Sequence, residues 1–203
     1  MLDWIKEGKL GPWSVEHFEI TREKAAIYTI GCYGTYEVPP HPGTYTRLFH
    51  EKRGVVMSDT RQEMLHLRDF DNMLDDATIK KAHINGLGLG ICTKMALDAG
   101  FRVAVVEVDP DVIELVGKQL LAMYPQGLAI YLGDALEWRP QTSKGHKEYG
   151  VVWHDIWDEA SDEVWDQYKL LMRRWGRATQ FQGAWGRDWI LRQKREERRW
   201  RYH

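Results

Sequence analysis

Ile84-Asn85-Gly86-Leu87-Gly88-Leu89-Gly90 lies between a short apolar segment and a stretch with the pattern of a helix. Glycines let the backbone turn sharply and allow a ligand to approach the peptide N–H groups, and the N-terminus of a helix favours anionic groups. About 20 residues further on, residues 103–109 form a second apolar run that ends in carboxylates, which can accept hydrogen bonds from ribose hydroxyls. This order of strand, glycine turn, helix and acidic strand predicts a nucleoside-binding half-site.

Strands alternate with helices over most of the chain from here onward. We expect strands at 81–85, 101–108, 128–132 and 149–154, and helices at 91–99, from Pro110 onward, at 162–174 and in the arginine-rich C-terminal segment. The alternation predicts an α/β fold, a Rossmann-like and mainly parallel sheet with helices on both faces. After Asp158 only residues 178–182 suggest another short strand. The sheet is therefore either truncated at its C-terminal strands or completed by the N-terminal region or by another subunit, as in a homodimer.

The first 59 residues have a different pattern, with short alternating segments separated by turns. We expect a short helix at 1–10, strands at 17–21, 26–30 and 54–58, and a loop at Pro39–Gly43. A helix capped by Ser58 or Asp59 then runs through Leu67. The sequence thus predicts a small, antiparallel β-rich region at 1–59 that could cover the site as a lid, and a Rossmann-like domain at 60–203.

Composition describes an ordinary globular protein, with 203 residues, 43% apolar residues and 29% charged residues. Cys32 and Cys92 are the only cysteines, so a disulfide framework is not expected and a reducing cytoplasm fits. No apolar run approaches the roughly 20 residues of a membrane span, and the first residues do not resemble a secretory signal. We therefore expect no membrane association.

The C-terminal segment 171–203 is strongly basic, with ten Lys or Arg residues against three acidic ones. Arginines interleaved with Trp175, Trp185, Trp189 and Trp200 could contact nucleic acid through phosphates and stacking. The alternative, which we favour, is a solvated helix whose tryptophans pack inward and whose arginines pair with the acidic body.

Each of the four expected strands ends in a glycine or an acidic residue. These residues are Gly86, Gly88 and Gly90, then Glu107, Asp134 and Asp155. Because ligands of open α/β sheets bind at the carboxyl ends of the strands, we expect these residues to meet around one crevice.

Several of these positions have a competing structural interpretation. We assign Glu107 to ribose binding and Asp109 to the cap of the helix that begins at Pro110. Asp134 could accept a hydrogen bond from an adenine amine or could simply stabilise a turn. Asp155 is the better candidate for catalysis, while Asp158 is expected to cap the next helix and His154 to be packed or hydrogen-bonded.

Together, residues 85–90, Val105-Val106-Glu107-Val108-Asp109, Gly133-Asp134-Ala135 and Asp155-Ile156-Trp157-Asp158 resemble class I S-adenosylmethionine-dependent methyltransferases, and in particular their spermidine-synthase-like branch. The resemblance covers about residues 50–170. It implies that Gly86, Gly88 and Gly90 face the amino-acid part of S-adenosylmethionine, that Glu107 holds the ribose, and that Asp134 and Ala135 meet the adenine. Asp155 would match the acidic position that serves substrate and chemistry.

The expected activity is therefore transfer of a methyl group to an unidentified, small-molecule acceptor. Aminopropyltransferases of the same branch usually carry an acidic residue in the glycine loop, where this chain has Leu89. Aminopropyl transfer is accordingly the second expectation. The third is a non-catalytic module that binds nucleic acid or a partner chain through its basic C-terminus.

Overall fold

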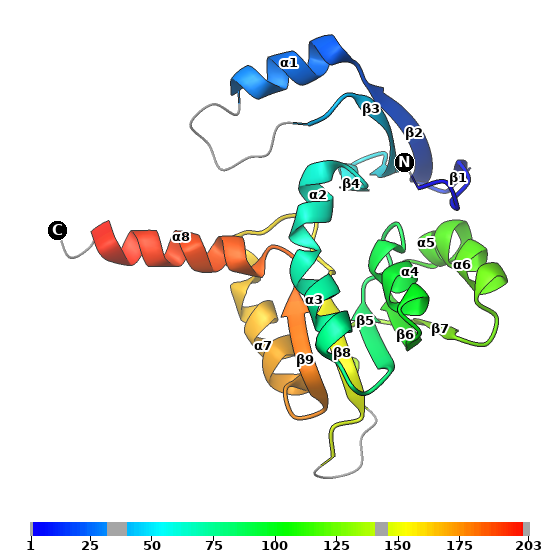
Figure 1. Ribbon diagram of the computed structural model, residues 1–203, viewed down its shortest axis with the longest axis vertical. Coiled ribbons are helices and arrows are strands. Elements are labelled where there is room, and N and C mark those ends of the chain that lie inside the picture. The colour runs from blue at the N-terminus through cyan, green and yellow to red at the C-terminus, as the bar shows by residue number, and fades with distance from the viewer. Residues whose placement is uncertain (1, 32–39, 141–145, 201–203) are drawn as a thin grey trace.

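The protein contains two sheets, seen in a computed structural model that describes residues 2–31, 40–140 and 146–200 (Figure 1). The larger sheet has the strand order β7-β6-β5-β8-β9 and is parallel throughout. Its strands are β5 (Lys81–Asn85), β6 (Arg102–Glu107), β7 (Leu128–Leu132), β8 (Tyr149–His154) and β9 (Thr179–Ala184). The chain thus has the predicted α/β, Rossmann-like fold. The expected short strand near 178–182 exists as β9 and forms one edge of the sheet.

Helices cover both faces of this sheet, as the alternation predicted. One face packs on α3 (Arg68–Asp76), α4 (Ile91–Asp98) and α6 (Lys118–Met123), with a continuous core that includes Phe70, Ala96 and Leu120. The other face packs on α7 (Trp165–Trp175), whose Trp175 is stacked on His83 with ring centroids 4.2 Å apart. Between β6 and α6 the chain forms α5 (Pro110–Val112) and a π-helical turn, Ile113–Gly117.

The N-terminal region is an antiparallel four-stranded sheet with the order β1-β2-β3-β4. Its strands are β1 (Gly8–Leu10), β2 (Trp13–Ile20), β3 (Gly43–His50) and β4 (Gly54–Ser58), and α1 (Arg22–Gly31) connects β2 to the chain before β3. In Figure 1 this sheet lies across the end of the larger sheet at which the parallel strands finish. The predicted antiparallel β region is therefore present, and its position bears directly on the site.

Two local predictions in this region were wrong. The first residues include strand β1, which pairs with β2, and no helix is described there. Residues 26–30 were expected to form a strand but belong to helix α1, which begins after Thr21. The hydroxyl of Thr21 accepts a hydrogen bond from the backbone N–H of Lys24, an interaction typical of a helix start that outweighs a short apolar alternation.

The segment after β4 differs from the single helix expected. It forms α2 (Arg61–His66) and α3, which meet at Leu67, and Thr60 occupies the cap position in place of Ser58 or Asp59. The carboxylate of Asp59 instead accepts a hydrogen bond from the backbone N–H of Thr46. The break turns α2 toward the N-terminal sheet, which places Glu63 near the ends of the parallel strands.

Within the described ranges, no helix combines the length and apolar character that crossing a membrane requires.

Candidate active site

The glycine loop connects the end of β5 to the start of α4 in a conformation that requires glycine. Gly86, Gly88 and Gly90 have φ values of 94°, 50° and 75°. A Cβ atom on Gly86 would lie 1.9 Å from the carbonyl oxygen of Asp155. The loop after β5 therefore packs directly against the chain that leaves β8, the neighbouring strand.

Glu107, the last residue of β6, reaches back to this loop. Its Oε2 accepts a hydrogen bond from the backbone N–H of Leu87 at 2.8 Å, and its Oε1 accepts one from the backbone N–H of Asp109 at 2.9 Å. Each carboxylate oxygen has two acceptor sites, so both oxygens keep one for another donor. The expected proximity of Glu107 to the glycine loop is thus present.

Asp109 caps the helix that follows, as predicted from Pro110. Its Oδ1 accepts a hydrogen bond from the backbone N–H of Asp111 at 2.9 Å. Its Oδ2 also accepts a hydrogen bond from the indole N–H of Trp13 in β2, at 2.7 Å. This second contact ties the N-terminal sheet to the end of β6.

A cavity of about 320 Å³ lies where these strands end. Six of the predicted site residues line it, and these are Gly86, Gly88, Glu107, Asp134, Ala135 and Asp155. Gly90 is not among the lining residues. A Cβ atom on Gly90 would instead meet the side chains of Leu120 and Trp4. Gly90 therefore serves helix packing here.

Asp134 lies in the turn after β7 and shows features of both of its interpretations. Its Oδ1 accepts a hydrogen bond from the backbone N–H of Leu136 at 2.7 Å, which stabilises the turn. The residue also lines the cavity, beside the buried Ala135. A turn carboxylate at the cavity wall can also accept a hydrogen bond from a ligand amine.

Asp155 follows β8 and lines the cavity. In the strand order, the glycine loop after β5 lies between Asp155 and Glu107, which ends β6. Burial raises the pKa of its carboxyl to about 7, with further contributions from the negative charges of Glu63 and Glu107. Burial also raises the pKa of Glu63, although the indole N–H of Trp185 donates to its Oε2 at 3.2 Å. A carboxyl that titrates near neutral pH suits proton transfer.

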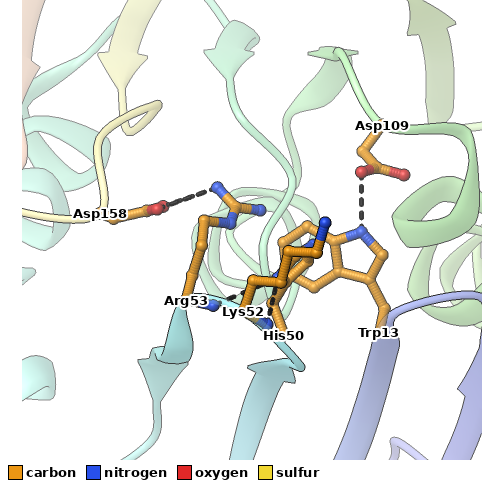
Figure 2. Close-up of polar contacts among 6 residues, drawn as sticks. All are labelled: Trp13, His50, Lys52, Arg53, Asp109 and Asp158. Atoms are coloured by element: carbon orange, nitrogen blue, oxygen red, sulfur yellow. Dashed lines mark hydrogen bonds and ion pairs between the residues drawn. The ribbon is translucent and has the colours of Figure 1, made fainter.

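The N-terminal sheet closes the cavity through residues that the sequence did not reveal. Arg53 binds both carboxylate oxygens of Asp158, at 2.9 and 3.2 Å, and its guanidinium lies 4.6 Å from the ring centroid of Trp13 (Figure 2). Figure 2 shows the Trp13–Asp109 bond beside this pair. The predicted capping role of Asp158 was wrong, because its carboxylate is held by Arg53 and the helical segment that follows begins after Ser161.

The N-terminal β region, which was expected to cover the site together with its loop at residues 39–43, lines one side of the cavity, but that loop does not contribute to the lining described. Pro39 lies outside the described residues, and residues 40–43 are not among those that line the cavity. Strands β3 and β4 supply the cover instead, through Leu48, Val56 and Met57. The sulfur of Met57 lies 3.3 Å from the backbone nitrogen of Leu89, so this side chain rests on the glycine loop.

His154 is packed in the core, as predicted, and belongs to a short polar chain beneath the cavity. The side-chain amide of Asn85 donates to Nδ1 of His154 at 2.7 Å, and Nε2 of His83 donates to Oδ1 of Asn85 at 3.0 Å. Burial lowers the pKa of His83 to about 4 and that of His154 to about 3. Both rings are neutral at physiological pH, and neither lines the cavity.

No family model and no curated protein matches this chain. Solved structures of methyltransferases share parts of the fold at low identity. The 23S rRNA methyltransferase ErmE has a TM-score of 0.43 and 13% identity over 58% of this chain and 44% of that one. A geranyl diphosphate methyltransferase bound to sinefungin has a TM-score of 0.44 and 15% identity over 59% and 42%. A dimethyladenosine transferase from Plasmodium falciparum has a TM-score of 0.37 and 21% identity over 52% and 35%. The matched part is less than half of each of these proteins.

Proposed function

We propose that this chain is an S-adenosylmethionine-dependent methyltransferase. The observation that carries the proposal is the bond between Glu107 and the glycine loop, at the wall of one cavity shared with Asp134 and Asp155. A carboxylate fixed at this place can accept hydrogen bonds from ribose hydroxyls, as in other nucleoside-binding sites at the ends of parallel strands.

The residues present fit this cofactor. The cavity of about 320 Å³ falls in the range of small-molecule sites. Glu107 would hold the ribose, Asp134 with Ala135 would meet the adenine, and the backbone at Gly86 and Gly88 would face the amino-acid part. The cofactor supplies a methyl group already activated by its positively charged sulfonium.

The protein then has to position the acceptor, exclude water and remove a proton. Trp13, Trp157 and Trp185 form apolar walls of the cavity, which limits the access of water. Holding the reactants in line removes much of the entropic cost of their encounter. Asp155, whose pKa is raised to about 7, would accept the proton that a nucleophilic acceptor must lose.

Isothermal titration calorimetry with S-adenosylmethionine and with its product S-adenosylhomocysteine tests the proposal. We expect saturable binding of both at one site per chain. A variant with Glu114→Gln, an exposed carboxylate paired with Lys118, should bind as the wild type does. Absence of heat and of any thermal stabilisation at millimolar cofactor would contradict the proposal.

Aminopropyl transfer from the decarboxylated cofactor is an alternative use of the same cavity. That cofactor lacks a carboxylate, so an acidic residue in the glycine loop would favour it, whereas Leu89 is apolar and fully buried. Titration with both cofactors compares the two functions directly. Tighter binding of S-adenosylmethionine supports methyl transfer, and a preference for the decarboxylated form supports aminopropyl transfer.

The basic C-terminus is the basis of the non-catalytic alternative. Helix α8 (Arg187–Trp200) starts at the body of the protein, and its far end projects from that body in Figure 1. Ile190 is buried, and Lys194 pairs with Asp162 at 2.6 Å, in keeping with a helix docked on an acidic body. Trp189 departs from the expected inward packing, since 49% of its surface is exposed. Binding of nonspecific RNA that falls steeply between about 50 and about 200 mM salt would favour a nucleic-acid module.

A further inference from the structure

The cavity is strongly acidic. Among the residues that the structure describes, its walls contain one basic side chain and six carboxylates, which are Glu63, Glu107, Asp109, Asp134, Asp155 and Asp158. The basic residue, Arg53, is already paired with Asp158. Any ligand that enters therefore meets an excess of negative charge, which favours a cationic group and disfavours an anionic one.

Five of the six carboxylates already accept a hydrogen bond from the protein. Glu107 and Asp134 accept hydrogen bonds from backbone N–H groups, and Asp109 accepts one from a backbone N–H and one from the indole of Trp13. Glu63 accepts a hydrogen bond from the indole of Trp185, and Asp158 accepts one from Arg53. In the part of the chain that the structure describes, no donor reaches the carboxylate of Asp155. Asp155 is partly exposed at the cavity wall, so its carboxylate is open to accept a hydrogen bond from a ligand.

The order of the strands divides the cavity into two halves. Gly88, Glu107 and Asp134 belong to the half above β5, β6 and β7, which the proposed cofactor would occupy. Asp155 follows β8 and Trp185 follows β9, and Glu63 on α2 is bonded to Trp185. The second half thus combines two carboxylates with an indole, and Glu63 is near enough for its charge to act on Asp155.

We infer that the acceptor is a small aliphatic amine, bound as an ammonium ion between Asp155 and Glu63 against the ring of Trp185. This inference rests on the proposed methyltransferase function and assigns its substrate class. An ammonium group supplies the donors that Asp155 lacks and is attracted by an indole face. Before it can act as a nucleophile, the nitrogen gives one proton to Asp155. The N–H bond breaks, its electron pair stays on nitrogen as the lone pair, and an O–H bond forms on the carboxylate.

Other acceptor classes fit these walls less well. A phosphodiester chain would bring further negative charge to a rim that already includes Asp109, Asp134 and Asp158. An alcohol can donate a hydrogen bond to Asp155 but leaves the combined charge of Asp155 and Glu63 without a counter-ion. Of these three classes, only the amine supplies both the missing donor and a positive charge.

Binding of ethylammonium chloride tests the inference without reference to activity. We expect it to raise the Tm of the wild type in a concentration-dependent manner, beyond equal concentrations of sodium chloride or ethanol. Asp155→Asn and Glu63→Gln should each abolish this shift. Asp166→Asn, at a carboxylate that is 88% exposed, should retain it. Equal shifts in the wild type and in both cavity variants would overturn the inference.

Transfer of a labelled methyl group from S-adenosylmethionine gives the second readout. We expect n-butylamine and benzylamine to be methylated and n-butanol, benzyl alcohol and an RNA oligonucleotide not to be. Asp155→Asn should lower turnover by about 100-fold or more, as expected for loss of a proton acceptor, while cofactor affinity changes by less than about threefold. Cofactor binding with methylation of RNA or alcohols but not of amines overturns the acceptor class alone. Failure of cofactor binding overturns the proposed function itself, whatever ethylammonium does.

Discussion

The carboxylate of Glu107 and the backbone N–H of Leu87 lie 2.8 Å apart, although 20 positions separate them in the sequence. This bond joins the end of β6 to the glycine loop after β5 and fixes both at the cavity wall. A hydrogen bond to a charged group contributes about 1.5–3 kcal/mol, so the arrangement is well defined before any ligand binds. It holds the carboxylate of Glu107 in one orientation at the cavity wall, as the proposed contact with ribose requires.

Glu107→Gln should weaken binding of S-adenosylmethionine by at least about tenfold, since about 1.4 kcal/mol corresponds to a factor of ten. The amide keeps the size of the side chain but directs an NH₂ group at a backbone N–H or at the ligand. Calorimetric titration measures the loss. The matched variant Glu114→Gln removes an exposed charge, and an equal loss of affinity there would show that the effect is not specific to Glu107.

Gly86→Ala should destabilise the fold more than Gly100→Ala does. Both glycines have positive φ, at 94° and 80°, so each alanine carries a cost of about 1–2 kcal/mol for a left-handed backbone. Only at Gly86 would the new Cβ also meet backbone, 1.9 Å from the carbonyl oxygen of Asp155. Urea denaturation of the two variants isolates the second cost. Equal destabilisation would contradict the close packing of the two loops.

Asp155 should make stability depend on pH in a direction opposite to that of an ordinary paired carboxylate. Its pKa rises from 3.8 to about 7 on folding, so between these values the folded state holds more protons than the unfolded chain. The free energy of unfolding contributed by this group therefore falls as pH rises through that window. Asp155→Asn removes the effect, and should stabilise the protein by more at about pH 8.5 than at about pH 4.5.

Four other titratable groups act on or with Asp155, and each has to be considered in this experiment. Glu63 and Glu107 carry negative charge toward it, while Cys92 and Tyr168 feel its charge and have raised pKa values. The thiol and the phenol stay neutral over the pH range used. Because the carboxylates are common to wild type and variant, the difference between the two proteins reports on Asp155. A pH-independent difference would contradict the shifted pKa.

The N-terminal sheet contacts the ends of the parallel strands through Trp13–Asp109 and Arg53–Asp158. Loss of the Trp13 contact should lower the free energy of unfolding more than loss of the Arg53 contact. Trp13→Phe removes a partly buried hydrogen bond to the Asp109 carboxylate, and we expect a loss of about 1.5–3 kcal/mol in unfolding free energy. Arg53→Ala breaks an ion pair whose side chains are 43% and 41% exposed, which should cost about 1 kcal/mol or less. Thermal and urea denaturation give both values. A larger loss for Arg53→Ala would contradict this ranking.

The parallel sheet was readable from the sequence because four of its five strands are short apolar runs that end in, or are followed directly by, glycine or an acidic residue. Residues 81–85, 128–132 and 149–154 form strands within the bounds expected. The meeting of Glu107 with the glycine loop followed from a general property of such sheets, in which the carboxyl ends of strands share one edge. These residues owe their placement to regular local structure.

The contacts by which the N-terminal sheet closes the cavity could not be predicted from the sequence. Trp13 meets Asp109 across 96 positions and Arg53 meets Asp158 across 105, and neither pair has a spacing that marks it. Asp158 has the pattern of a helix cap, and only the docking of the N-terminal sheet gives it Arg53 as a partner. Helix α1 was missed because its alternating apolar residues suit a strand, and Ile27 and Tyr28 are exposed on it.

A crystal structure of the protein grown with S-adenosylhomocysteine tests the central claim most directly. We expect the adenosyl group in the cavity at the ends of β5, β6 and β7, with a ribose hydroxyl within hydrogen-bond distance of Glu107. We also expect Asp155 to face the thioether end of the ligand and to make no contact with adenosine. An adenosyl group bound elsewhere, or a ribose with no contact to Glu107, would contradict the account.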